Sequence, residues 1–588
     1  MELHQPTLQG HTAGNLRERQ GVLPALLPAQ KRQSFFSQLP RRENQVQKAK
    51  GPILRTISPP KETSSSVLQS PSTDKEKDKF EWYRNWYPMT PVDYLEPGKP
   101  HPITLLGKNL VLWKDETGQW SCLEDICSHR LARLSEGRIE PKTGNLMCSY
   151  HGWQFNGQGQ CTAIPQAESA DAEKTMCANS NSCVKKFPVQ EAIGLLWVWP
   201  ESGPMASLEA SAKALHIPKG WDTEPEQWLP LKHWFMRDVP YSWDTLIENV
   251  VDPSHVAFAH HGIQGNREKP MMLRMNLEGN MTLPEGFTVA AHPINKVAAR
   301  VGAAGREDAA AGAEHPARPQ RNVKAGKQGT MDKFGKHEGK QAEASAPPPP
   351  TLISFKPPDY TLYEVSGGRI NMLNYAVPTA PGTARLLHKV VGDRRKLDKK
   401  IQKIAGFKPD LLICKDHMEN NAIIDGDGVF LHFQERDQTH REGEKHAYRS
   451  EYFMPTSMDR AVTLFRKWWD LAGAHVPWAD GAQPGMSSKP SRQEMLDRWN
   501  SHTKFCPTCQ KALRQLKMLQ KVAAIAAGAS LLVAAGLAGG ALAGASAPPQ
   551  AWKIGAGALG GVFLAAFAAW LEQWKSYFFF RDYVHSEH

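Results

Sequence analysis

The stretch that decides the fold is Cys127-Ser128-His129, followed further along the chain by Cys148-Ser149-Tyr150-His151. Together these two segments offer two thiolates and two imidazoles, which is a complete ligand set for a metal centre. Zinc accepts such a set, but its fingers pair Cys with Cys and His with His at close spacing, whereas each segment here offers one of each. The pattern therefore favours a centre that draws one Cys and one His from each of two facing loops.

A Rieske [2Fe–2S] centre has this arrangement, because one iron takes the two Cys and the other takes the two His. The predicted cluster ligands are Cys127, His129, Cys148 and His151. The flanking residues Arg130-Leu131-Ala132 and Gly152-Trp153 agree with this prediction. Neutral imidazole in place of thiolate removes negative charge and raises the reduction potential. The sequence thus predicts an electron-transfer cluster.

A second group of candidate ligands lies between Glu248 and Gly262. Two His and one carboxylate can hold Fe(II) and leave positions open for O₂. His255 and His260 are five residues apart, which on a regular helix turns them by about 140°. They can face one metal only if the helix breaks or bulges between them. His260 is the preferred second ligand, and His261 remains an alternative.

The carboxylate must come from elsewhere, and the segment Ile423-Ile424-Asp425-Gly426-Asp427-Gly428 offers two. Asp427 is the first candidate and Asp425 the second. We expect a strand or the start of a helix after a glycine turn as their platform. The alternative is that both aspartates merely form that turn.

The chain has 588 residues, enough for several domains, and its nine cysteines are too sparse for a secreted disulfide scaffold. Its net charge of +11 is not gathered into one basic helix, so nucleic-acid binding is not expected. Residues 1–78 are basic and serine-rich, as in an organelle transit peptide, with a disordered basic tail as the alternative. Residues 79–200 predict an all-β domain, with a strand over 103–113. Residues 201–505 mix helices and strands and contain an insert, 297–350, without apolar periodicity.

Two uncharged apolar stretches follow, residues 522–543 and 554–571, each long enough to cross a membrane. The spacing of Gly536, Gly540 and Gly544, and of Gly557 and Gly561, suits close helix packing. We predict two transmembrane helices within 522–571, preceded by a linker (506–521) and followed by a tail (572–588). A buried soluble helical hairpin is the alternative.

Several further segments carry a resemblance to a known family. They are Glu248–His261, Gln493–Arg498, His502–Thr503, Cys506-Pro507-Thr508-Cys509 and Phe580–Glu587. From Phe80 onward, the chain resembles the chloroplast Rieske-type non-haem iron monooxygenases of chlorophyll metabolism. The resemblance implies an α+β fold, with a Rieske domain followed by a helix-grip catalytic domain of antiparallel sheet and helices.

The resemblance also implies a reaction and its partners. Reduced ferredoxin supplies electrons, O₂ is activated, and the macrocycle of pheophorbide a opens to red chlorophyll catabolite. The alternatives are oxygenation of another tetrapyrrole, such as protochlorophyllide or a phyllobilin, and redox sensing at a protein translocon. The implied location is a chloroplast membrane, inner envelope or thylakoid, with the catalytic body facing the stroma.

Four residue roles come with the resemblance. It implies that Asp252 passes electrons between subunits of a homotrimer, with a helix-capping role as the alternative, and Asn249 is a further catalytic candidate. We interpret Cys506 and Cys509 as a redox-regulatory pair and a thioredoxin target. The alternative is half of a zinc site, for which no second ligand pair lies nearby in the sequence.

Overall fold

The structure is a computed structural model that describes residues 80–115, 117–294, 348–406, 409–439, 448, 451–486, 490–543 and 551–587. The expected transit segment, 1–78, lies outside the described residues. So does the expected insert, 297–350, except for its last three residues.

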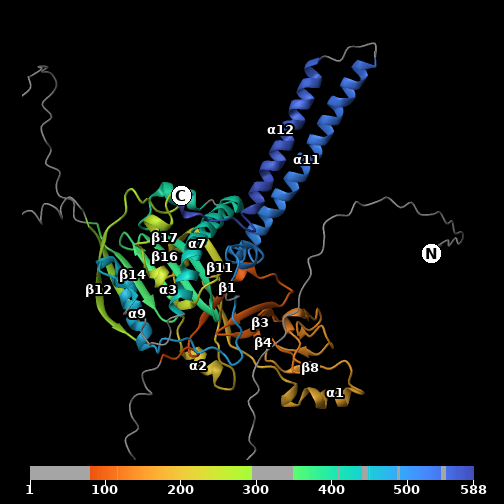
Figure 1. Cartoon of the computed structure of the whole chain (residues 1–588). Helices are drawn as coiled ribbons and strands as arrows, with labels where there is room; N and C mark the ends of the chain where they lie inside the picture. Colours follow the sequence, from red (N-terminus) through yellow and green to blue (C-terminus); the bar gives the residue numbers. More distant parts are fainter. Residues whose placement is uncertain are drawn as a thin grey trace, which may run out of the picture. The chain divides into compact units, whose positions relative to one another are not determined.

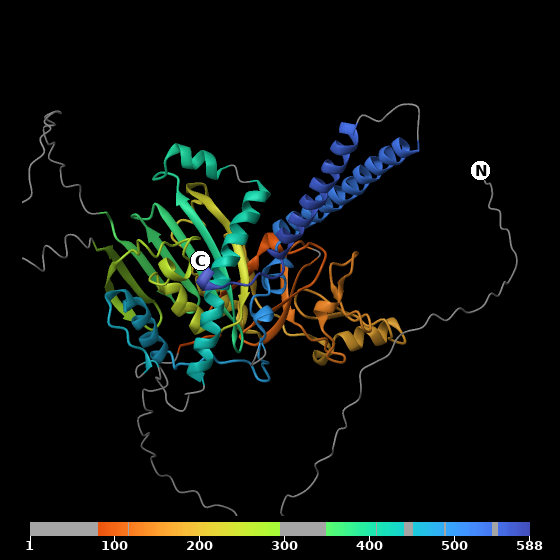
Figure 2. The same ribbon diagram turned by 45° about the horizontal axis from the view of Figure 1, so that its top comes forward.

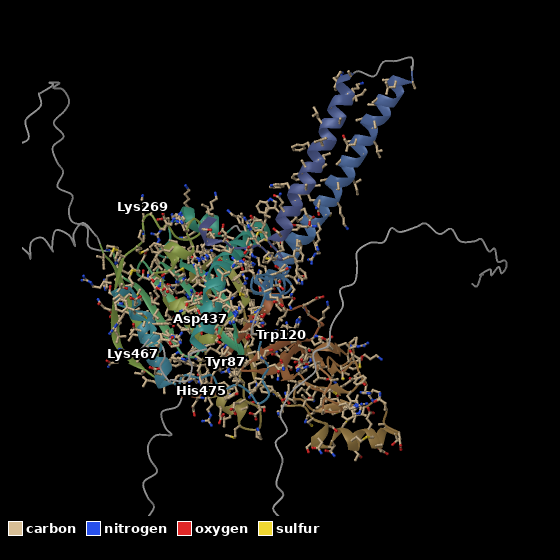
Figure 3. The ribbon with its side chains drawn as sticks, viewed as in Figure 1. Tyr87, Trp120, Lys269, Asp437, Lys467 and His475 are labelled. Atoms are coloured by element: carbon tan, nitrogen blue, oxygen red, sulfur yellow. The ribbon has the colours of Figure 1, made fainter. Side chains whose placement is uncertain are left out.

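The N-terminal domain contains three small antiparallel sheets. The first joins β1 (Tyr87–Pro91), β10 (Leu195–Val198) and β9 (Val189–Ala192), and the second joins β2 (His101–Leu105), β3 (Lys108–Lys114) and β4 (Trp120–Glu124). The single strand expected over 103–113 is thus a hairpin that turns at Leu106 and Gly107. Tyr87, labelled in Figure 3, is fully buried and donates its hydroxyl hydrogen to the Trp82 carbonyl oxygen at 2.8 Å.

The third sheet of this domain follows the first Cys–His segment and holds the second one between β6 and β7. It joins β5 (Arg138–Ile139), β6 (Leu146–Met147), β7 (Gln154–Phe155) and β8 (Cys161–Ala163). One helix, α1 (Ala170–Cys177), follows it, so the expectation of a purely β domain is wrong in this detail. Ser169 begins α1 by accepting a hydrogen bond from the Ala172 N–H, as an N-cap residue does.

The second domain is built on one antiparallel sheet of seven strands (Figure 1). The strands, in order across the sheet, are β11 (Trp228–Val239), β17 (Thr383–Asp393), β16 (Ile370–Ala380), β15 (Tyr360–Val365), β14 (Thr351–Lys356), β13 (Gly286–Pro293) and β12 (Leu273–Thr282). β13 and β14 flank the expected insert, and they pair with each other directly. The insert is therefore a connection between neighbouring strands of one sheet, which explains why the domain tolerates it.

Helices pack on this sheet and at its β11 edge. α3 (Trp243–Val251) and α9 (Arg460–Leu471) contact the sheet through a shared aromatic core that includes Trp243, Phe355 and Trp468. The 30-residue helix α7 (Asp410–Thr439) contacts β11. The shorter helices are α2 (Ala206–Ala212), α4 (Val256–Ala259), α6 (Lys399–Ala405) and α10 (Arg492–Met495).

Two long helices, α11 (Pro507–Leu542) and α12 (Ala551–Ser576), lie side by side in Figures 1 and 2. Each contains an 18-residue stretch of high mean hydropathy, 2.0 in α11 and 1.9 in α12, and both are long and apolar enough to cross a membrane. Gly561 belongs to the contact between them, because a Cβ there would lie 2.6 Å from Leu531 Cγ. Gly536 and Gly540 face open space, and Gly544 lies outside the described residues. The expected linker, 506–521, is helical, since α11 already begins at Pro507.

Candidate metal centres

The two Cys–His loops have the same backbone hydrogen-bond pattern. The Cys127 N–H donates to the Ala132 carbonyl oxygen, five residues on, and the Cys148 N–H donates to the Trp153 carbonyl oxygen, also five residues on. Leu131 and Gly152 close the loops by donating back to the carbonyl oxygen of the cysteine, and both have positive φ, at 61° and 76°. The local sequence therefore folds each Cys–His segment into the same tight loop.

The four predicted cluster ligands sort by type. The thiols of Cys127 and Cys148 are buried and interact with each other. The rings of His129 and His151 lie nearer the surface, with centroids 4.5 Å apart. In a Rieske cluster, one iron binds a pair of thiolates and the other iron binds a pair of imidazoles. These residues fit the cluster.

Electrostatics at Cys127 agree with a cluster ligand. Burial raises the pKa of the Cys127 thiol to about 11, while the backbone N–H groups of His129 and Arg130 are directed at its sulfur and oppose that shift. A bound metal deprotonates a coordinating thiol outright, and N–H groups of this kind then stabilise the negative sulfur.

In the second group, the helix breaks where the spacing of the histidines requires it. α3 ends at Val251, His255 begins the single turn of α4, and His260 follows it with the non-helical angles φ −113° and ψ 32°. The two imidazole rings consequently face each other, with centroids 5.1 Å apart. His261 is occupied elsewhere, because its Nδ1 accepts a hydrogen bond from the Arg267 N–H at 3.1 Å.

Asp427 comes to these histidines from α7. Its Oδ1 lies 3.3 Å from His260 Nε2 and 3.8 Å from His255 Nε2. One ligand atom from each of the three residues lies within 4.8 Å of the others, close enough for one metal ion. The expected platform is wrong, however, because Asp427 stands inside a long helix and not at a turn, a strand or a helix start.

Asp425 has a different environment, although it is only two residues away. Its side chain is fully buried, with Oδ1 2.5 Å from Arg237 and Oδ2 2.7 Å from Arg498. The two guanidinium groups occupy both carboxylate oxygens. The structure thus brings Asp427, and not Asp425, to the histidines.

Asp252 and Asn249 both contact His255. Asp252 Oδ2 lies 3.4 Å from His255 Nδ1, and Asn249 Nδ2 lies 3.5 Å from His255 Nε2. Burial disfavours the Asp252 carboxylate, but hydrogen bonds from His255 and Ser254 outweigh it and hold the pKa of Asp252 below its ordinary value. Asp252 is therefore ionised at neutral pH and orients the His255 ring.

A cavity of about 640 Å³ opens onto this group. Its lining includes Asn249, Asp252, His255, Phe258, Asp427, Phe430 and Tyr452. This volume is within the range of about 300–1,000 Å³ that small-molecule sites occupy. The lining mixes apolar side chains, such as Phe258 and Phe430, with polar ones, and it includes His255 and Asp427. A substrate in this cavity would therefore lie beside the candidate metal ligands.

Cys506 and Cys509 are buried free thiols, and they lie against two further histidines, His417 and His502. Sequence reasoning missed both. His417 is 89 residues before Cys506, and no local pattern links them. His502 lies close by, inside a stretch that carried the family resemblance, and its proximity to the two cysteines was a usable signal.

The two centres define a Rieske-type oxygenase: an electron-transfer domain is joined to a sheet domain with a His–His–Asp group open to a cavity. Comparisons with known proteins agree. Residues 85–188 match the Rieske [2Fe-2S] domain family, and residues 337–445 match the family described as pheophorbide a oxygenase.

Three chloroplastic proteins are similar over most of the chain. Pheophorbide a oxygenase of Arabidopsis thaliana is 31% identical over 91% of each protein. Flavonoid 8-hydroxylase 2 of Ocimum basilicum is 30% identical over 82% of this chain and 85% of its own. Protochlorophyllide-dependent translocon component 52 of Arabidopsis thaliana is 31% identical over 76% of each. The chain belongs to the pheophorbide a oxygenase family of Rieske oxygenases.

Proposed function

We propose that the protein is a ferredoxin-dependent monooxygenase that opens the macrocycle of pheophorbide a to red chlorophyll catabolite. The observation that carries the proposal is the grouping of His255, His260 and Asp427 beside the 640 Å³ cavity, which His255 and Asp427 line directly. A protein that only carried or sensed electrons would need the Rieske loops and no second ligand group. Sequence similarity to pheophorbide a oxygenase over 91% of the chain supports the choice of this substrate.

Different residues would bind the iron and the substrate. His255, His260 and Asp427 would hold one iron, and three protein ligands leave open positions for O₂ beside a bound substrate. Such an iron supplies oxygen activation, and the Rieske cluster supplies single electrons. The apolar part of the cavity lining, which includes Phe258 and Phe430, would hold a flat hydrophobic ring beside these ligands and exclude water.

Electron delivery would use Asp252. One of its carboxylate oxygens contacts His255, and its side chain keeps 22% of its exposure, so the carboxylate can also be reached from outside. We propose that it accepts a hydrogen bond from a Rieske histidine of a neighbouring copy, in a head-to-tail homotrimer. The exposed His129 supports this role, because a cluster that serves a second copy must present its imidazoles at the surface.

The hairpin of α11 and α12 would anchor the protein in a chloroplast membrane, envelope or thylakoid, with the catalytic body in the stroma. Several basic side chains precede the apolar part of α11, namely Lys511, Arg514, Lys517 and Lys521. Basic residues favour the side of a membrane from which a hairpin inserts. Reduced ferredoxin is a stromal electron donor of suitable potential for a Rieske cluster, which places the donor on the same side.

A product assay tests the proposal. Purified protein, with both iron sites loaded, receives pheophorbide a, reduced ferredoxin and O₂ under dim light, and the products are weighed by mass spectrometry. Gain of oxygen with loss of the macrocycle absorption is the expected result. Unchanged pheophorbide a would reject this substrate.

Parallel reactions with protochlorophyllide and a phyllobilin test the alternative tetrapyrroles. A reaction with a flavone is added because one similar protein is named as a flavonoid 8-hydroxylase. A redox-sensing role at a translocon is distinguished by Asp427→Ala. Sensing would survive this change, because the cluster remains, whereas oxygenation would stop.

A further inference from the structure

The buried His–Cys cluster (His417, His502, Cys506 and Cys509) is separate from both iron centres. One ligand atom from each of the four residues lies within 4.8 Å of the others, and all four side chains are buried. They come from three elements: α7, the π-helical turn Trp499–Thr503, and the start of α11. A closed set of four soft and borderline ligands is typical of a structural metal site.

His502 is held in the form that a metal ligand needs. Its Nδ1 lies 2.7 Å from the Met236 carbonyl oxygen, which can only accept, so Nδ1 carries the proton. The unprotonated Nε2 then points its lone pair at Cys509 Sγ, 3.3 Å away. Metal-binding histidines are commonly oriented by a backbone carbonyl in this way.

The sulfur of Cys506 lies at the N-terminus of α11, where it accepts a hydrogen bond from the Cys509 N–H at 3.5 Å. The positive end of a 36-residue helix and a directed N–H group both favour a thiolate. The Cys-x-x-Cys spacing is also the one that zinc sites use.

Direct hydrogen bonds do not account for the whole cluster. His417 Nδ1 lies 3.4 Å from Cys506 Sγ and 3.5 Å from Cys509 Sγ, so one ring nitrogen faces two sulfurs at similar distance. A ring nitrogen has a single proton or a single lone pair to offer. One cation between the ligand atoms would bond all of them at once.

The distances fit a single tetrahedral ion. Zn–S bonds of about 2.3 Å and Zn–N bonds of about 2.05 Å place sulfur and nitrogen about 3.5 Å apart across a tetrahedral angle. Three of the four sulfur–nitrogen pairs lie at 3.3, 3.4 and 3.5 Å. A two-iron cluster would spread the thiolates and the imidazoles further, because they would bind different irons.

We propose that the buried His–Cys cluster is a closed structural site for one zinc ion. The ion would fasten the start of the membrane hairpin to α7, the helix that carries Asp427. Asp427 lies ten residues beyond His417, or about 15 Å along the helix. The site would thereby fix the position of a helix on which the catalytic group depends.

Metal analysis of the full-length protein, purified in detergent after growth with zinc and iron, tests the proposal. We expect about one zinc per chain beside about three irons, two in the cluster and one at the mononuclear site. Protein grown with cobalt should show the thiolate-to-cobalt charge-transfer and strong visible bands of a tetrahedral site. These measurements need no variant, so a folding defect cannot obscure them.

Three variants locate the metal. His502→Gln should lose at least four-fifths of the zinc and retain the Rieske absorption. Cys414→Ala is the matched control, because Cys414 is a buried neighbour of Cys509 outside the four-residue cluster, and it should keep the zinc. Asp427→Asn should also keep the zinc, which excludes zinc bound in the mononuclear iron site.

Two results would overturn the proposal. One is fully iron-loaded wild-type protein with less than a tenth of an equivalent of zinc, or with a fourth iron in its place. The other is recovery of Cys506 and Cys509 as a disulfide from protein alkylated immediately after lysis, which would support a redox switch instead.

Discussion

Replacing Asp425 by Asn should unfold the catalytic domain more easily, whereas the same change at Asp427 should remove iron and leave the fold intact. Asp425 is buried between two guanidinium groups, at 2.5 Å from Arg237 and 2.7 Å from Arg498. An amide at this position leaves two buried cations without a counter-charge. Breaking a buried ion pair from one side costs about 3–5 kcal/mol.

That loss should be visible in thermal unfolding. For a cooperative unit of roughly 250 residues, 1 kcal/mol shifts Tm by about 2–4 °C, so Asp425→Asn should lower it by roughly 10 °C. Asp427 lies beside the two histidines and has no arginine partner among the described residues, so its Asn variant should unfold within about 2 °C of the wild type when both proteins are stripped of mononuclear iron.

Circular dichroism of the chelator-treated proteins gives the two transitions, and metal analysis of untreated protein gives the iron. The expected pattern is a low Tm with iron retained at low temperature for Asp425→Asn, and a normal Tm with one iron lost for Asp427→Asn. Loss of iron in the Asp425 variant alone, with Asp427→Asn fully loaded, would refute the assignment of the two carboxylates.

Three further changes test other parts of the structure. Asp252→Asn should keep the cluster and the iron but slow electron transfer from the cluster to the iron at least tenfold, because the amide lacks the negative charge that Asp252 places beside His255. Stopped-flow absorption of the reduced cluster measures this rate, and an unchanged rate would exclude the role. Gly152→Ala should lower the cluster occupancy and the Tm of the Rieske domain. Gly152 has a φ of 76°, and the new Cβ would lie 3.1 Å from Pro165 Cγ, at a cost of about 1–2 kcal/mol. Visible absorption per chain measures the cluster occupancy. Gly561→Leu should separate α11 from α12 and expose both helices to protease in detergent. Gly540→Leu is the control and should not, because its side chain would meet open space. Equal protection of the two variants from protease would contradict the packing of α11 against α12 at Gly561.

The Rieske loops could be predicted from the sequence because all their determinants are local. Each loop closes within six residues through backbone hydrogen bonds, and each contributes one Cys and one His at a fixed offset. An interruption of regular helix at these histidines was also predictable, since two ligands five apart cannot share a face of a continuous helix. It lies at His260, where the single turn of α4 ends. The two long apolar helices were predictable from the length and composition of two stretches of sequence.

The choice between Asp425 and Asp427 depends on tertiary structure. Asp-Gly-Asp-Gly is a sequence typical of a turn, because glycine disfavours helix interiors. The helix persists there because tertiary packing outweighs that propensity: a Cβ on Gly426 would lie 3.1 Å from the ring of Tyr583, which approaches closely from the C-terminal tail. Once the segment is helical, two positions differ by about 200°, so one carboxylate faces the histidines and the other faces two arginines.

The buried His–Cys cluster also depends partly on local sequence and partly on tertiary structure. The sequence determined that Cys506 and Cys509 are spaced closely enough to bind the same metal ion, because Cys506 is the N-cap residue of a helix and Cys509 lies in its first turn. It did not determine what completes the pair, because His417 reaches the cysteines only when α7 packs beside the start of α11. Contacts between residues far apart in the chain are decided by how helices pack in three dimensions, and a linear spacing rule has no access to that information.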